Sequence, residues 1–170
     1  MPVPASAPLP TGSRPSPGWA AVAAAVLAVL TLAAAPPWLG FEGGAAVRQA
    51  FAGLCHQLPH RSPQVHGVPF ALCHRCTGIV GGLALGVLAG PLAPVAALGR
   101  LTSARPLVVL ALAATPTGAD WLLGVAGVWA NTGASRLLTG ALFGAVAGLL
   151  VAAAFCAPGR VTPTVTPDAV

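Results

Sequence analysis

The sequence predicts an all-α integral membrane protein, a four-helix bundle with a Cys/His-rich loop between the first two spans. Hydrophobic residues make up 56% of its 170 residues and charged residues only 6%, whereas soluble domains carry about 25% charged residues. Four stretches are long enough to cross a hydrocarbon core, which takes roughly 20 apolar residues. By contrast, all four histidines and three of the four cysteines fall between Cys55 and Cys76.

We expect one membrane domain, residues 19–157, between two disordered tails, residues 1–18 and 158–170, that are rich in Pro, Ser and Thr. The expected spans cover about residues 19–39, 77–98, 106–128 and 137–157, and the Cys/His loop covers 40–76. A short alanine run at the end of the first span resembles a signal-peptidase site. Because Pro36 follows it, we expect this helix to be retained; cleavage would leave three spans.

The net charge of +5 is spread over short loops and tails. This pattern indicates orientation in a bilayer, whereas nucleic-acid binding would need a clustered basic face, so lipid is the expected partner and nucleic acid is not. An even number of spans places the Cys/His loop and the third loop, residues 129–136, on one membrane face. With Arg61 and Arg75 set aside as members of a site, the arginines favour cytoplasmic tails and an extracytoplasmic Cys/His loop.

Glycines recur every four residues in the second and fourth spans, at Gly78, Gly82, Gly86, Gly90, Gly140, Gly144 and Gly148. Residues at this spacing share a helix face, and glycine lets two backbones approach closely in lipid. We therefore expect the second and fourth helices to pack through these faces, which also offer a route to a homo-oligomer. Both ladders open with Thr-Gly-x3-Gly-x3-Gly, which indicates a parallel repeat of helix pairs.

Asp120 is the only acid within a span. A carboxylate at the centre of a bilayer costs about 2.5–3.5 kcal/mol on insertion scales, so it needs a cation or water. Arg75 and Arg136 open the second and fourth spans on the same membrane face and are the expected partners, and Asn131 adds hydrogen-bonding capacity nearby. A salt bridge that only locks the bundle is the alternative to a functional role.

The Cys/His segment favours a metal site. Cys73 and Cys76 form a C-x2-C knuckle, whose spacing lets two thiolates reach one ion, and zinc accepts tetrahedral Cys3His or Cys2His2 ligand sets. Zinc is the first choice of metal, while Cu(I) also suits thiolates. The predicted ligands are Cys55, His56, Cys73 and Cys76. The residues expected to support them are His60, Arg61, Arg75, Asp120, Asn131 and Arg136.

Three other functions fit the same residues. C-x2-C is the spacing of dithiol oxidoreductases, and the flanking His74 and Arg75 would lower a thiol pKa. A structural disulfide suits an extracytoplasmic loop, although it leaves one of the three cysteines unpaired. A small transporter or assembly subunit would use Asp120 and the arginines along a path for an anion or a proton, and it would need an oligomer. The residues assign no reaction, so whether the protein is an enzyme stays open.

The combined pattern resembles a family of small prokaryotic multi-pass membrane proteins that is catalogued only as a domain of unknown function. The resemblance rests on Cys55-His56-Gln57 with Arg61-Ser62, then Cys73-x-Arg75-Cys76-x-Gly78, and it extends to Asp120, Asn131, Arg136 and Thr139-Gly140. It covers roughly residues 50–150. The family signature is Cys-His-Gln-x3-Arg-Ser followed by Cys-x-Arg-Cys-x-Gly. It implies a multi-pass membrane domain in which these residues belong together, and it implies no reaction.

Overall fold

The computed structural model describes residues 15–93 and 105–156, so most of the two expected tails lies outside the described residues. Within them, four long helices follow one another: α1 (Pro17–Ala34), α3 (His74–Ala89), α5 (Pro106–Val125) and α6 (Gly133–Phe155). α3 continues into a short 3-10 turn, η3 (Gly90–Leu92). All four are long and apolar enough to cross a membrane. The predicted all-α membrane bundle is confirmed.

The helix ends differ from the expected spans by a few residues. α3 begins three residues and α6 four residues before the expected starts at 77 and 137. Both helices open with polar first turns, which a search for apolar stretches leaves out. At α6 the Thr132 hydroxyl accepts the Ser135 N–H at 3.0 Å and caps the helix. Residues 94–98 of the expected second span lie outside the described residues.

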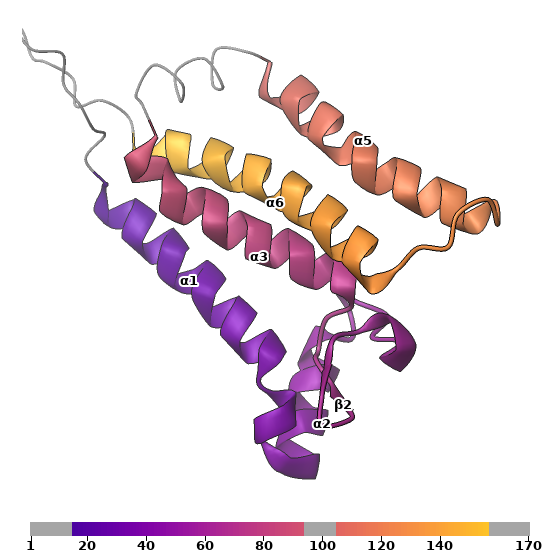
Figure 1. Ribbon diagram of the computed structural model, residues 1–170. Coiled ribbons are helices and arrows are strands. Elements are labelled where there is room, and N and C mark those ends of the chain that lie inside the picture. The colour runs from indigo at the N-terminus through magenta and orange to yellow at the C-terminus, as the bar shows by residue number, and fades with distance from the viewer. Residues whose placement is uncertain (1–14, 94–104, 157–170) are drawn as a thin grey trace, which may run out of the picture.

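The four helices lie side by side in a row (Figure 1). α3 packs mainly against α6, while α1 lies on the other flank of α3 and α5 on the other flank of α6. The outer helices are therefore covered on one side only, and just 11% of the spanning window of α1 and of α5 is buried. Their apolar outer faces suit lipid.

Glycines make the closest helix contact, that between α3 and α6. Gly78 lies against Leu137, and Gly86, two turns further on, lies against Ala145, so the two helices run parallel in register. A Cβ added to Gly82 would collide with the backbone carbonyl of Ala141. The expected packing of the second and fourth helices through their glycine faces is thus present within one chain. A homo-oligomer through these faces stays a prediction.

The segment 40–76 is more ordered than the loop expected there. It holds the helix α2 (Gly40–Phe51), the 3-10 turn η2 (Pro59–Arg61), and the strands β1 (Gln64–Val65) and β2 (Val68–Pro69), and a further 3-10 turn, η1 (Pro36–Trp38), precedes it. The strands form an antiparallel hairpin whose two turn residues, His66 and Gly67, both have positive φ, 50° and 76°. Such a turn matches the twist of a hairpin.

A small apolar core fastens this segment to the membrane helices. It consists of Ala33, Phe51, Cys55, Ala71 and Leu72, all buried, with Cys73, Cys76 and Val80 packed against it. The Ala71 N–H also donates to the Ala33 carbonyl at 2.8 Å, so the chain just before α3 is tied to the last turn of α1. The cysteines consequently lie where the segment meets the helices.

Candidate metal centre

Three cysteines from two separate segments converge at this junction. Cys55 follows α2, Cys73 is the residue before α3, and Cys76 is in the first turn of α3. Their Sγ atoms all lie within 4.8 Å of one another, and this is the one group of three or more potential metal ligands within the described residues. Two of the three come from the C-x2-C spacing, and the fold brings the third from 18 residues away.

Backbone hydrogen bonds hold the three thiols in place. The Cys55 N–H donates to the Phe51 carbonyl at 3.0 Å, so the end of α2 fixes this cysteine. The Cys73 N–H in turn donates to Cys55 Sγ at 3.3 Å, which ties the two cysteine segments together. The hydrogen bond from the Cys76 thiol lowers the pKa of the Cys73 thiol to about 5, although burial acts in the opposite direction. Cys73 is therefore a thiolate at neutral pH.

The apolar core screens the thiols on one side. Cys55 is only 6% exposed, and Cys73 and Cys76 are half-buried. Their other side borders a pocket of about 500 Å³ that opens between the Cys/His segment, α5 and the start of α6. The three sulfurs thus have the apolar core on one side and the pocket on the other, and the pocket leaves room for one more ligand.

The histidines take different positions. His56 is exposed and lines the pocket beside Cys55, but it is not part of the three-sulfur group. His60 is exposed on η2 and is not among the pocket residues. His74, which the sequence did not place in the site, has Nδ1 2.7 Å from the Arg61 carbonyl, and its ring lies where a side chain at Gly133 would be. It links η2 and the starts of α3 and α6.

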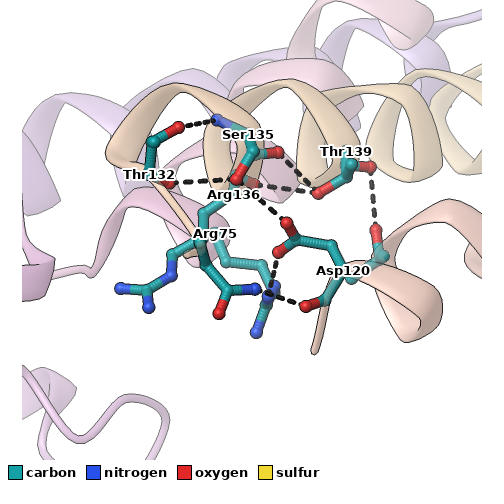
Figure 2. A network of polar contacts seen from close by, with 8 residues as sticks. Arg75, Asp120, Thr132, Ser135, Arg136 and Thr139 are labelled. Carbon is teal, nitrogen blue, oxygen red and sulfur yellow. Dashed lines mark hydrogen bonds and ion pairs between the residues drawn. The ribbon is translucent and has the colours of Figure 1, made fainter. Parts of the chain in front are cut away.

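Asp120 of α5 is 7% exposed and forms an ion pair with Arg75, with Arg75 Nη2 and Asp120 Oδ2 2.6 Å apart. The Ser135 hydroxyl donates to Asp120 Oδ1 at 2.9 Å, and the Asn131 side-chain amide donates to the Asp120 backbone carbonyl. Figure 2 shows this network between the starts of α3 and α6 and the facing turn of α5. The carboxylate thus joins three helices near the pocket.

Arg136, the other expected partner of Asp120, forms no ion pair within the described residues. Its guanidinium points away from Asp120 in Figure 2, and the residue lines the pocket together with Arg61, Arg75 and Asn131. Nine of the ten predicted site residues therefore lie in the pocket wall or directly behind it, and His60 does not. Gln57, which the sequence gave only as part of the Cys-His-Gln motif, also lines the pocket, and its amide donates to the Arg48 carbonyl at 2.6 Å. The apolar wall residues were not predicted; they are Leu54, Leu58, Trp121 and Val125.

A family model described as "Predicted membrane protein (DUF2085)" matches residues 55–150, more than half of the chain. The chain belongs to this family. The DUF2085 match begins at Cys55 and so includes the three converging cysteines, the ion pair and the pocket arginines. The expected Cys-His-Gln and Cys-x-Arg-Cys signature itself stays a prediction. No curated protein and no solved structure matches the chain.

Proposed function

We propose that this membrane protein binds a zinc-like metal ion through Cys55, Cys73 and Cys76. The observation that carries the proposal is the convergence of three Sγ atoms within 4.8 Å. In a tetrahedral site with Zn–S bonds of about 2.3 Å, neighbouring sulfurs are about 3.8 Å apart. Sulfurs that already lie within 4.8 Å of one another need to approach by about one ångström or less to reach that spacing.

The fourth position of such a tetrahedron faces the pocket. His56 follows Cys55 directly in the chain and lines that pocket. We propose its imidazole nitrogen as the fourth ligand, which completes a Cys3His set. Three thiolates and a neutral histidine around Zn²⁺ carry a net charge of −1. The pocket arginines offset this charge, since Arg61, Arg75 and Arg136 line the same pocket.

Metal analysis of the purified protein tests the proposal. We expect about one zinc per chain for the wild type and a loss of at least about tenfold in affinity for Cys73→Ser, because one of three sulfur ligands is removed. Cys156→Ser is the matched control, since Cys156 is buried at the other end of α6. A metal-free wild type with three intact thiols would reject the proposal.

A second function, thiol–disulfide exchange, is favoured by the Cys73 thiolate. Cys73 would attack a disulfide of a partner protein and form a mixed disulfide with one sulfur, releasing the other as a thiol; Cys76 would then displace the first sulfur, leaving a Cys73–Cys76 disulfide and a fully reduced partner. Cys76→Ser should trap the mixed disulfide. If Cys76→Ser traps no partner under oxidising conditions, thiol–disulfide exchange is rejected.

We also propose that the Cys/His segment is extracytoplasmic and the chain ends cytoplasmic, on the arginine distribution of the sequence. His66→Cys places a thiol in the exposed hairpin turn. A membrane-impermeant maleimide should label this variant in intact cells more strongly than the parent protein. Labelling that increases only after the cells are lysed would reverse the orientation.

A further inference from the structure

We infer that the pocket beside the cysteines binds a phosphate group. The pocket is lined by Arg61, Arg75 and Arg136, and no acid is among its lining residues. The carboxylate of Asp120, which is not among the lining residues, already forms an ion pair with Arg75. Three guanidinium charges against the Asp120 carboxylate and the Cys73 thiolate leave an excess of one positive charge around a cavity of about 500 Å³. This inference goes beyond the proposed metal site and does not require the metal.

The backbone adds to the positive charge of the pocket. Arg75 is in the first turn of α3 and Arg136 in the first turn of α6, and neither first turn holds an acidic residue. A helix N-terminus carries a partial positive charge, so a cation there is unfavourable. Two parallel helices place two arginines at such ends, and the chain offers no further carboxylate there within the described residues. An external anion would offset the unfavourable positive charge at both helix starts.

Polar contacts hold the backbone of one pocket arginine and the side chain of another. The Arg61 carbonyl is bonded to His74 at 2.7 Å, which fixes η2 to the start of α3. Asp120 holds the Arg75 guanidinium at 2.6 Å. Arg75 keeps further N–H donors, and Arg61 and Arg136 have no ion-pair partner within the described residues. The three guanidinium groups can therefore donate hydrogen bonds to a ligand in the pocket.

The number of donors favours phosphate over a carboxylate ligand. A carboxylate has two oxygens, and a single bidentate arginine occupies both. A phosphate group offers three or four oxygens and takes several guanidinium groups at once, as arginine clusters in phosphate sites do. The wall also has an apolar part, in which Leu54, Trp121 and Val125 are all more than half exposed. The pocket therefore fits a phosphate that carries an apolar group.

A phospholipid headgroup and a soluble phosphate share this chemistry. Two probes separate them in delipidated protein kept in a neutral detergent. Inorganic phosphate is measured by equilibrium dialysis. Short-chain phosphatidylglycerol is measured by native mass spectrometry, with the matching diacylglycerol as the probe that lacks a phosphate. Binding of phosphatidylglycerol alone indicates a lipid ligand, binding of inorganic phosphate alone or of both indicates recognition of the phosphate group itself, and each outcome supports the inference.

Arginine variants decide whether binding occurs in this pocket. Removing one charge-assisted partner should weaken phosphate binding at least about tenfold in Arg136→Gln and in Arg61→Gln. Arg105→Gln, which removes the same charge from the exposed residue before α5, should bind like the wild type. Because Arg61 is exposed on η2, its variant keeps the test valid if Arg136→Gln fails to fold.

The inference is overturned if neither probe binds, if the diacylglycerol binds as well as the phosphatidylglycerol, or if Arg136→Gln and Arg61→Gln bind like Arg105→Gln. The zinc content of the same samples separates the two claims. A metal-free protein that binds phosphate in this pattern would reject the metal proposal alone. A zinc-loaded protein that ignores both probes would reject the phosphate inference alone.

Discussion

Along most of their length, α3 and α6 contact each other through glycine and bare backbone, whereas at their first turns the neighbours are arginine, aspartate and thiol. In the glycine region a single added Cβ at Gly82 or Gly144 would collide with a carbonyl of the facing helix. In the polar region, by contrast, Arg75 Nε is buried without a partner among the described residues, and two more arginines border an open pocket. The first region explains why the helices associate, and the second holds groups that association does not require.

The largest expected effect on stability is in the glycine region. Gly82→Leu should destabilise the folded protein by about 3 kcal/mol or more, because the side chain would be forced into the Ala141 backbone and the helices would have to separate. Thermal unfolding in detergent measures the loss. Gly81→Leu is the matched control, since an added Cβ there meets nothing within 4 Å. Equal effects of the two substitutions would contradict the packing described for α3 and α6.

A smaller loss is expected where α5 joins the other helices. Asp120→Asn removes the partner of Arg75 and should cost about 2 kcal/mol, less than for a fully buried pair because the Arg75 side chain is 21% exposed. Ser135→Ala removes one hydrogen bond to the same carboxylate and should cost about 1 kcal/mol. The unfolding midpoints of the two variants measure both losses of stability. If Asp120→Asn is more stable than the wild type, burial of the carboxylate outweighs its ion pair.

The smallest effect on folding is expected at the thiols, where reactivity is the sensitive measure. Because the Cys73 pKa is lowered to about 5, its thiolate persists as the pH falls and is lost only near pH 5. In chelator-treated protein, the iodoacetamide reaction of Cys73 should be nearly flat from pH 6 to 8, where an ordinary thiol with a pKa of about 8.5 gains about tenfold per unit. Cys76→Ala should raise the pH midpoint of the Cys73 reaction. An unchanged midpoint would show that Cys76 does not cause the lowered pKa of Cys73.

The sequence predicted the regular part of the fold well, because the rules that govern it are local. An apolar stretch of about 20 residues must form a helix in lipid, and glycines four residues apart must share a face. The same rules failed at the polar helix starts, where Thr132 and Cys73 precede first turns that a search for continuous apolar stretches leaves out. They also gave no sign of α2 or of the hairpin within residues 40–76.

The candidate site was predictable in its residue types and less so in its geometry. The C-x2-C spacing placed Cys73 and Cys76 together, but only the apolar core around Phe51 and Leu72 brings Cys55 to them. Likewise, Asp120 required a cation, yet the choice of Arg75 over Arg136 depends on how α5 lies against α3 and α6. His74 was considered only as a neighbour of the thiols, because its contact with the distant Arg61 carbonyl has no signal in the sequence. Each of these depends on contacts between segments far apart in the chain.

X-ray absorption at the zinc edge of the purified, zinc-loaded protein tests the central claim most directly, namely that three converging thiolates form one metal centre. The account predicts three sulfur neighbours at about 2.3 Å and one nitrogen or oxygen neighbour at about 2.0–2.1 Å. In Cys55→Ser the sulfur count should fall to two, which shows that the distant cysteine is a ligand. A zinc bound by nitrogen and oxygen alone, or a sulfur count unchanged in Cys55→Ser, would contradict the account.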